Sequence, residues 1–479
     1  MSSGPPSRHF YLIAIGGTAM TPLAGLLCEK GETVLGSDLL PLYPPMSDRL
    51  AALGLTVLPG FRAENLPSGV DRVVVGNLAG KDNPELVEAL ARGLRVTSMP
   101  ETLREEILPG RHPVVIAGTH GKTTTTAFTA WLLASAGRAP GYLIGGEPRN
   151  FPSPSVLGTG AAFVIEGDEY STSYADKGPK FLHYAPRTLV LTSVEFDHAD
   201  LYADLDAVKD AFRKGVALVP EDGLIVAAAG DRNIDDVLAG AGARVVRYGL
   251  EDASADVAAW NVVRHGDGAS FDVVVKGAEP FRAEIALSGL HNVANALAAV
   301  AAARPFGLTN EELARGLATF SGVKRRQEER GTAGGITVID DFAHHPTAVR
   351  TTLDGLRHRY PGRRLVAVFE PRSITAGRAE FREPYRDALA LADVVAIARP
   401  FHEERLSRPG GPGSLDVPAL IGELEARGLE AVTGDSADAL VAALAPRLRE
   451  GDVVLVMSSG SFGGIHDKLL EAVAVTQAI

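Results

Sequence analysis

The run Val114–Thr126 constrains the fold of this chain more than any other segment. Its β-branched start predicts a buried strand, and a turn bracketed by Gly118 and Gly121 follows. Such a turn presents backbone N–H groups to phosphate at a helix N-terminus. Lys122 would add a positive charge there, and Thr123 a hydroxyl for Mg²⁺. The Gly-x-x-Gly-Lys-Thr spacing is two residues shorter than the general P-loop pattern, so it predicts a compact variant of the triphosphate loop.

Strand-like runs alternate with Ala- and Leu-rich helical stretches along the chain, which predicts α/β layers with mostly parallel sheets. A chain of 479 residues suits about three domains. Loop-like sequence before residue 111 and a basic stretch at 322–326 mark the boundaries. We expect a Rossmann-like N-terminal domain at 1–110, a central P-loop ATPase-like domain at 111–321 and a C-terminal Rossmann-like α/β domain at 322–479.

Composition excludes several classes of protein. The net charge of −12 disfavours a nucleic-acid partner, and no apolar run approaches the ~20 residues that would insert into a membrane. Cys28 is the only cysteine, which excludes an intrachain disulfide and a Cys-based metal site. The start, Met1–Phe10, lacks the apolar core of a signal peptide. We therefore expect a cytoplasmic enzyme; nothing in the sequence predicts its oligomeric state.

The first strand-turn unit matches a dinucleotide fingerprint only loosely. Gly-x-Gly-x-x-Gly would need glycine at 14, 16 and 19, where the chain has Ala14, Gly16 and Ala19. This disfavours nicotinamide binding, but a nucleotide diphosphate at the same helix N-terminus needs only close backbone approach. Asp38 ends the second strand, where it either meets a sugar hydroxyl or caps a turn.

Carboxylates and a histidine follow two later strands. Glu166, Asp168 and Glu169 come directly after a buried strand, and Asp197 and His198 end another. Carboxylates near a phosphate loop can hold Mg²⁺ directly or through water, although a solvated acidic loop is the alternative. An imidazole beside them can coordinate a metal or orient a phosphate.

Four weaker signals lie in the second half of the chain. Asn292 could meet a purine edge or cap a helix. Arg326 could contact phosphate when domains close, or belong to a basic linker. Asp341 could hold a ribose hydroxyl or end an acidic turn. The Ser- and Gly-rich loop after Met457 predicts an anion-binding nest that suits the carboxylate of an amino acid or peptide.

Taken in order, four motifs resemble the Mur ligase family of cell-wall amide-bond ligases. They are Gly118–Thr125, Asp197-His198, the run 291–296 with Asn292 and Asn295, and the run Asp340–Thr347. The last resembles the branch of the family that uses UDP-N-acetylmuramate itself. Two activities share that branch, addition of L-alanine and addition of an intact tripeptide. Segments 43–47, 180–188, 195–200, 322–326 and 461–466 are more similar to the tripeptide-adding members.

The resemblance implies ATP-driven amide formation in peptidoglycan recycling, with only small molecules as partners. The lactyl carboxylate of UDP-N-acetylmuramate would take the γ-phosphate of ATP, giving an acyl phosphate. The amine of the murein tripeptide L-alanyl-γ-D-glutamyl-meso-diaminopimelate would then displace phosphate. The alternatives are ligation of L-alanine in de novo synthesis and a non-catalytic relative that only binds the sugar nucleotide.

The resemblance also implies roles for individual residues. ATP would meet Gly118, Thr119, His120, Gly121, Lys122, Thr123, Thr124, Asn292, Arg326 and Asp341, and Mg²⁺ would meet Thr123, Glu169 and His198. The catalytic residues would be Lys122, His198, Arg326 and His344. The UDP-sugar would lie on Gly16, Gly17, Thr18 and Asp38, and the peptide on Ser458, Ser461 and Phe462.

One family feature is expected to be missing. Several Mur ligases carry a carbamylated lysine a short distance after the Asp-His pair. Arg213, followed by Lys214, stands at that place in this chain. We therefore predict that no lysine is carbamylated and that other groups complete the Mg²⁺ shell.

Overall fold

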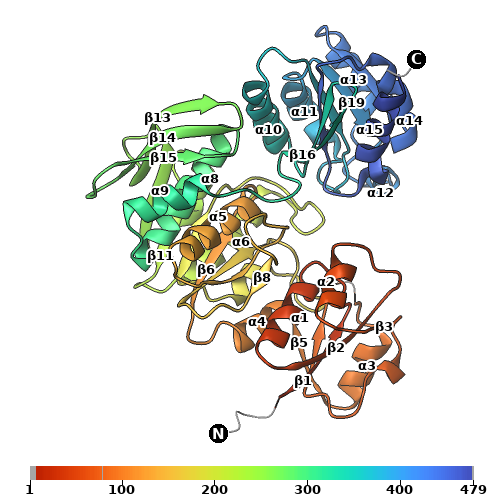
Figure 1. The fold of residues 1–479 in the computed structure, drawn as a ribbon. Helices are drawn as coiled ribbons and strands as arrows, with labels where there is room; N and C mark the ends of the chain where they lie inside the picture. Colours follow the sequence, from red (N-terminus) through yellow and green to blue (C-terminus); the bar gives the residue numbers. More distant parts are fainter. Residues whose placement is uncertain (1–6, 78, 477–479) are drawn as a thin grey trace.

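The computed structural model describes residues 7–77 and 79–476. Three separate sheets with flanking helices form three lobes that follow one another along the chain (Figure 1). The predicted α/β class is confirmed. Met1–Pro6, part of the start for which we expected no signal peptide, lies outside the described residues.

The first sheet is parallel throughout, in the order β3-β2-β1-β4-β5, with the first strand at its centre. This doubly wound order brings the turn after β1 to the carboxyl edge of the sheet, where such folds bind nucleotides. The elements are β1 (His9–Ile13), α1 (Met20–Glu29), β2 (Thr33–Asp38), α2 (Met46–Ala52), β3 (Val57–Pro59), β4 (Arg72–Val75), α3 (Pro84–Ala91), β5 (Arg95–Ser98) and α4 (Met99–Glu106).

The second sheet has the order β15-β14-β13-β12-β11-β10-β6-β9-β7-β8. It is parallel from β13 to β7, and an antiparallel ribbon, β13–β15, extends one end. Its strands are β6 (His112–Ala117), β7 (Gly141–Leu143), β8 (Ser155–Val156), β9 (Ala162–Gly167), β10 (Thr188–Leu191), β11 (Leu224–Ala228), β12 (Arg244–Leu250), β13 (Val257–His265), β14 (Gly268–Val275) and β15 (Phe281–Ile285). Its helices are α5 (Lys122–Ser135), α6 (Leu205–Ala217), α7 (Arg232–Leu238), α8 (Leu290–Ala303) and α9 (Asn310–Ala318). The ribbon departs from the expected strand–helix alternation, because its strands follow one another directly.

The third sheet, β16-β17-β21-β18-β19-β20, is parallel except for its antiparallel edge strand β16. Apolar side chains on its two faces form two separate cores. Its strands are β16 (Glu328–Ala333), β17 (Ile336–Asp341), β18 (Leu365–Phe369), β19 (Val394–Ala398), β20 (Glu430–Gly434) and β21 (Val453–Met457). Its helices are α10 (Pro346–Arg359), α11 (Arg382–Leu389), α12 (Glu403–Leu406), α13 (Val417–Glu425), α14 (Ala437–Leu444) and α15 (Ile465–Thr476).

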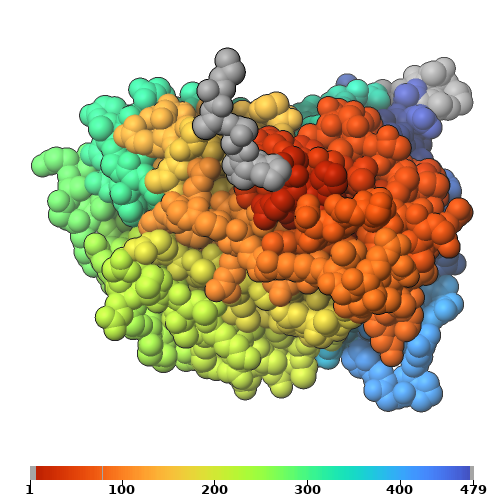
Figure 2. Space-filling view, turned by 90° about the horizontal axis from the view of Figure 1, so that it is seen from below, coloured from red at the N-terminus to blue at the C-terminus, as the bar shows by residue number. Residues whose placement is uncertain are grey.

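The lobes touch in sequence order. Figure 2 shows the first lobe, in red and orange, lying against the yellow-green second lobe, and Asn77 Nδ2 donates to Ser171 O across that boundary at 2.6 Å. The third lobe reaches the second where the Ala199 amide donates to Thr375 Oγ1 at 2.9 Å. The domain ranges expected from the sequence stay a prediction, which limited proteolysis would test. Across the described part of the chain, no helix combines the length and apolar character of a membrane span.

Candidate active site

The predicted phosphate loop joins β6 to α5, and both of its glycines have left-handed backbones. Gly118 has φ +126°, and a Cβ there would lie 2.2 Å from Thr192 Oγ1. Gly121 has φ +79°, and a Cβ there would lie 2.5 Å from Asn295 Oδ1. Helix α5 begins at Lys122, directly after Gly121. The short loop therefore needs glycine at both positions, for backbone conformation and for space.

Lys122 folds back over the loop from the start of α5. Its Nζ donates to Gly118 O at 2.6 Å and lies 2.8 Å from Glu169 Oε2. Burial alone would lower the pKa of this lysine, but the charges of Glu169 and Asp168 raise it above its usual value. Lys122 is therefore a buried cation held by groups that a bound phosphate would replace.

Three carboxylates lie beside the loop, and each has a different partner. Glu166 Oε1 accepts from Thr123 Oγ1 at 2.8 Å, Glu169 pairs with Lys122, and Asp168 Oδ2 lies 3.0 Å from Lys180 Nζ. Burial and the charge of Asp168 raise the pKa of Glu166. Our sequence interpretation did not select Glu166 as a ligand. No local sequence signal identifies it, because its place depends on the register that sets β9 against β6, with Glu166 opposite Ile116.

Oxygen atoms at this cluster suit Mg²⁺, which prefers hard oxygen ligands. The Thr123 hydroxyl donates to Glu166, and Glu169 pairs with Lys122, the residue before Thr123. Glu169 Oε2 is buried and lies against a single cation, Lys122 Nζ, at 2.8 Å, so it becomes free for a metal ion when that lysine moves. His198, with φ +53°, packs its ring 4.4 Å from that of Tyr170. The predicted set Thr123, Glu169 and His198 stays a prediction, and Glu166 joins it as a candidate ligand.

The third lobe contributes side chains to the same place. Arg326 Nη2 donates to Thr123 Oγ1 at 3.3 Å, and its guanidinium lies 5.1 Å from the ring of Phe342. His344 Nε2 lies 3.6 Å from Asp197 Oδ2. Burial would lower the pKa of His344, but its hydrogen bond with Asp197 and the charge of that carboxylate raise it. Arg326 therefore reaches the start of α5 and His344 reaches Asp197, and the catalytic roles expected of both residues stay predictions.

Glu195 forms a second contact between the lobes, which the sequence interpretation missed. Its Oε2 accepts from Thr347 Oγ1 at 2.7 Å and lies 3.5 Å from His120 Nε2 and 3.4 Å from His345 Nδ1. Burial would raise the pKa of Glu195, but hydrogen bonding with His120 brings it to about 2. Burial lowers the pKa of His345 to about 4. The ligand atoms of these two histidines and Glu195 lie within 4.8 Å of one another and could hold a metal ion.

Asn292 lies inside the first turn of α8, whose N-cap is Gly289. The alternative interpretation of Asn292 as a helix cap is therefore wrong. Its Nδ2 donates to Ser288 O at 2.8 Å, and its Oδ1 accepts from Asn295 Nδ2 at 3.2 Å. Asn295 Oδ1 in turn accepts from Thr125 Oγ1 at 3.2 Å. This chain of amides ties α8 to the phosphate loop.

Asp341, predicted to hold ribose, shapes its own turn. Its Oδ2 accepts from the Gln327 amide at 2.8 Å and its Oδ1 from the Ala343 amide at 2.7 Å. Arg213, at the place of the family's carbamylated lysine, ion-pairs with Asp210 at 2.5 Å. The ribose contact and the absence of carbamylation both stay predictions.

The predicted UDP-sugar residues meet at the turn after β1. Asp38 Oδ2 accepts from the Gly16 amide at 2.7 Å, and a Cβ on Gly16 would lie 2.9 Å from that oxygen. Ala14 has φ +63°, an uncommon conformation for alanine that marks a strained turn. Asp38 thus closes the turn, and the backbone around it offers N–H groups at the start of α1.

The predicted peptide residues lie after β21. Ser458 is buried and its hydroxyl donates to Glu370 Oε2, Ser461 is exposed, and Phe462 packs in the core with 2% of its surface exposed. A hollow of about 500 Å³ opens beside them. Charged side chains of both signs line it, among them Glu370, Arg399, Arg405 and Asp435. Its chemistry suits a zwitterionic acceptor, and the three residue assignments stay predictions.

Comparison with protein families gives three matches along the chain. Residues 9–108 match the model described as Mur ligase family, catalytic domain, residues 116–303 match the Mur ligase middle domain, and residues 325–460 match the Mur ligase, glutamate ligase domain.

Individual relatives match over nearly the whole chain. The UDP-N-acetylmuramate--L-alanyl-gamma-D-glutamyl-meso-2,6-diaminoheptandioate ligase of Escherichia coli strain K12 is 37% identical, over 97% of this chain and 98% of its own. The UDP-N-acetylmuramate--L-alanine ligase of Salinibacter ruber is 35% identical, over 97% and 94%. A crystal structure of a murein peptide ligase from Psychrobacter arcticus superposes with a TM-score of 0.72 at 36% identity, covering 98% of this chain and 99% of its own.

Proposed function

The chain belongs to the Mur ligase family of ATP-dependent amide-forming ligases, and from this premise we propose that it joins UDP-N-acetylmuramate to L-alanyl-γ-D-glutamyl-meso-diaminopimelate. The reaction would return an intact tripeptide to a sugar nucleotide, as peptidoglycan recycling requires. Because ATP and UDP-sugars are cytoplasmic metabolites, we propose that it proceeds in the cytoplasm.

The observation that supports this proposal is that cations from two lobes lie at the start of one helix, α5, directly after the phosphate loop. Lys122 of the second lobe begins the helix that holds Thr123, and Arg326 reaches Thr123 Oγ1 from the third lobe at 3.3 Å. A carboxylate and a triphosphate are both anions, so their reaction needs fixed positive charge where they meet. Cations supplied by two lobes would provide that charge once the lobes close on the nucleotide.

In the first step, a lactyl carboxylate oxygen attacks the γ-phosphorus, and ADP leaves. The Gly118–Gly121 loop would cradle the phosphates with its amides, while Lys122 moves from Glu169 to the phosphate oxygens. Arg326 would offset the charge that develops on the transferred group. Thr123, Glu166, Glu169 and His198 would hold Mg²⁺, which would withdraw charge from the phosphates.

In the second step, the peptide amine attacks the acyl carbon, and phosphate leaves from the tetrahedral intermediate as the amine loses a proton. The hollow beside β21, lined by Glu370 and Arg399, would hold the zwitterionic end of the peptide. His344 would orient the Asp197-His198 turn through its 3.6 Å contact with Asp197. Contacts between the second and third lobes would exclude water from the acyl phosphate.

The choice of acceptor rests on similarity to the tripeptide-adding enzymes of Escherichia coli and Haemophilus influenzae, at 37% and 36% identity over 97% of the chain. L-Alanine-adding relatives reach comparable identity, so L-alanine is the alternative acceptor. ADP release measured across L-alanine, dipeptide, tripeptide and tetrapeptide tests the choice. We expect turnover that needs both UDP-N-acetylmuramate and the tripeptide. Comparable turnover with free L-alanine would contradict the proposal.

A non-catalytic sugar-nucleotide-binding relative is the alternative from another class. The intact loop with Lys122 and Thr123 and the carboxylates beside it argue against that alternative. Wild-type protein that binds both nucleotides yet forms no amide would favour it. The same assay, run with and without bicarbonate, tests the absence of a carbamylated lysine, because rescue by bicarbonate at low CO₂ would contradict it.

A further inference from the structure

A second buried lysine lies beside the proposed metal site. Lys180 begins the short 3₁₀ helix Lys180–His183, and only 11% of its side chain is exposed. Its Nζ lies 3.0 Å from Asp168 Oδ2 and 5.7 Å from the ring centroid of Tyr170. The proposed reaction steps do not use this residue, which begins the segment 180–188 that is similar to the tripeptide-adding members of the family.

Lys122 and Lys180 each pair with a different carboxylate of this cluster. Lys122 neutralises Glu169, and Lys180 neutralises Asp168, whose charge is also felt at Lys122. When a nucleotide binds, Lys122 must leave Glu169 for the phosphates. Lys180 then remains the only one of the two lysines still paired with a carboxylate of this cluster. Without it, the incoming triphosphate would meet an uncompensated Asp168.

We propose that Lys180 is a positioning residue that holds Asp168 away from the metal shell and supplies the fixed positive charge that lets an anionic nucleotide bind beside three carboxylates. This inference rests on the proposed nucleotide site and is independent of which amine accepts the acyl group.

A purely structural role does not explain the pair well. Burying two charges costs desolvation that their attraction barely offsets, so a well-packed apolar side chain would serve stability equally well. Lys177, three residues earlier, offers a comparison, because it is exposed and its Nζ reaches only Ser173 O at 3.4 Å. The buried lysine is the one that faces the site.

The charge of the ligand separates the two explanations. ADP carries about three negative charges near neutral pH, and its Mg²⁺ complex about one. The electrostatic free energy lost with Lys180 scales with that charge. A loss of about twofold in affinity for Mg·ADP therefore corresponds to about eightfold, two cubed, for ADP alone. A side chain needed only for folding would weaken both forms alike.

The test is calorimetric titration of the full-length protein with ADP, once in EDTA and once with excess Mg²⁺. Lys180→Met should raise the Kd about eightfold in EDTA and about twofold with Mg²⁺. Lys180→Arg and the exposed control Lys177→Met should stay within twofold of wild type in both. The double variant Asp168→Asn/Lys180→Met restores the local net charge and should recover most of the affinity in EDTA.

Three outcomes would overturn the proposal. They are equal weakening of ADP and Mg·ADP by Lys180→Met, no change beyond twofold in either, and failure of the double variant to recover affinity. Wild-type protein that binds no ADP would instead overturn the proposed function itself. Because binding is measured without turnover, the identity of the acceptor does not enter.

Discussion

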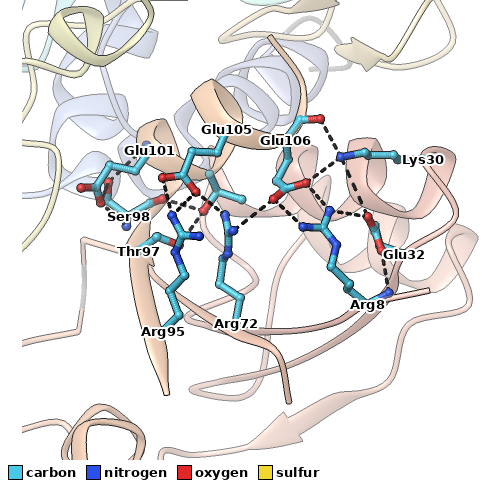
Figure 3. A network of polar contacts seen from close by, with 11 residues as sticks. Arg8, Lys30, Glu32, Arg72, Arg95, Thr97, Ser98, Glu101, Glu105 and Glu106 are labelled. Atoms are coloured by element: carbon cyan, nitrogen blue, oxygen red, sulfur yellow. Dashed lines mark hydrogen bonds and ion pairs between the residues drawn. The ribbon is translucent and has the colours of Figure 1, made fainter. Parts of the chain in front are cut away.

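Two polar clusters at opposite edges of their sheets differ in how completely their groups are paired. In the first lobe, Arg8, Arg72 and Arg95 at the amino ends of strands meet Glu105 and Glu106 of α4 (Figure 3). No residue of that network is among the described buried side chains that lack a hydrogen-bond partner. At the carboxyl edge of the second sheet, by contrast, the buried Glu169 Oε2 lies against one lysine, Lys122 Nζ at 2.8 Å, and His120 Nε2 lies 3.5 Å from Glu195 Oε2.

The cluster in the first lobe therefore stabilises the fold, whereas the cluster beside the phosphate loop can bind a ligand. Glu106 meets Arg8, Lys30 and Arg72, and although burial would raise its pKa, the hydrogen bonds from Arg8 and Lys30 bring it to about 2. Its lone pairs are used within the protein. Beside the phosphate loop, Lys122 and Glu169 pair with each other. A bound phosphate can replace Glu169 as the partner of Lys122, and a metal ion can replace Lys122 as the partner of Glu169. In these two clusters, a carboxylate shared among three fixed cations belongs to the stabilising network, and a carboxylate held by one lysine that can move belongs to the site.

The largest expected effect comes from removing the cation of the loop. Lys122→Ala should lower turnover about 10³-fold, because a preorganised charge on the transferred phosphate is lost. Binding of the UDP-sugar, whose proposed site lies on the first lobe, should change little. The matched control is Lys30→Ala in the ion network, for which turnover within about twofold of wild type and a lower melting temperature are expected. ADP release measures turnover, and thermal melts measure the melting temperature. Wild-type turnover in Lys122→Ala together with a large loss of turnover in Lys30→Ala would contradict the distinction between the two clusters.

Lowering the pH should destabilise the cluster of His120, Glu195 and His345 between the second and third lobes. The folded pKa of His345, about 4, lies below its unfolded value of ~6.5. The unfolded chain therefore binds more protons between these pH values, and stability falls as pH drops from 6.5 to 4, by up to about 3 kcal/mol. His345→Gln should flatten the melting temperature over this range. An unchanged pH profile in the variant would show that this histidine is not buried neutral.

Within the ion network, Glu106→Gln should cost about 2 kcal/mol, because charged hydrogen bonds are lost while cations stay partly buried. The folded pKa of Glu106 lies below its unfolded value, so its contribution is present above pH ~4.5 and lost as pH falls toward 2. The variant should lose less stability than wild type on acidification. Denaturant unfolding at pH 7 and pH 3 measures this, and equal losses would count against the assignment.

The smallest effect is expected from an exposed ion pair. Arg187 and Asp222 lie 2.6 Å apart, but 42% and 71% of their side chains are exposed. Solvent screens such a pair, so Asp222→Asn should change stability by less than about 1 kcal/mol and leave turnover unaltered. A larger loss in the same unfolding assay would mean that pairing alone, without burial, decides stability in this protein.

Much of the fold follows from local sequence. The strands β10, β17, β18 and β21 are continuous, largely apolar segments buried on both faces, and such segments favour central strands of a parallel sheet. The ribbon β13–β15 was not predicted. In the second half of β13, partly buried and exposed positions alternate, as expected when one face of a strand is covered and the other meets solvent.

The site was predictable where chemistry and position coincide in the sequence. The spacing of residues 118–123 predicts a turn bracketed by two glycines at a helix N-terminus, and the structure contains that turn. Pairing of Glu166 with Thr123 depends on the register of β9 beside β6, and the cluster of His120, Glu195 and His345 depends on how two lobes dock. Neither arrangement has a local sequence signal, because each joins residues separated by forty or more positions.

The most direct test of the account follows one oxygen atom. UDP-N-acetylmuramate labelled with ¹⁸O in its lactyl carboxylate would be incubated with ATP, Mg²⁺ and the tripeptide, and the released phosphate analysed by mass spectrometry. If the carboxylate attacks the γ-phosphorus and the peptide amine then displaces phosphate, each phosphate carries one ¹⁸O. Amide formation with unlabelled phosphate would contradict the acyl phosphate route for which this site is proposed.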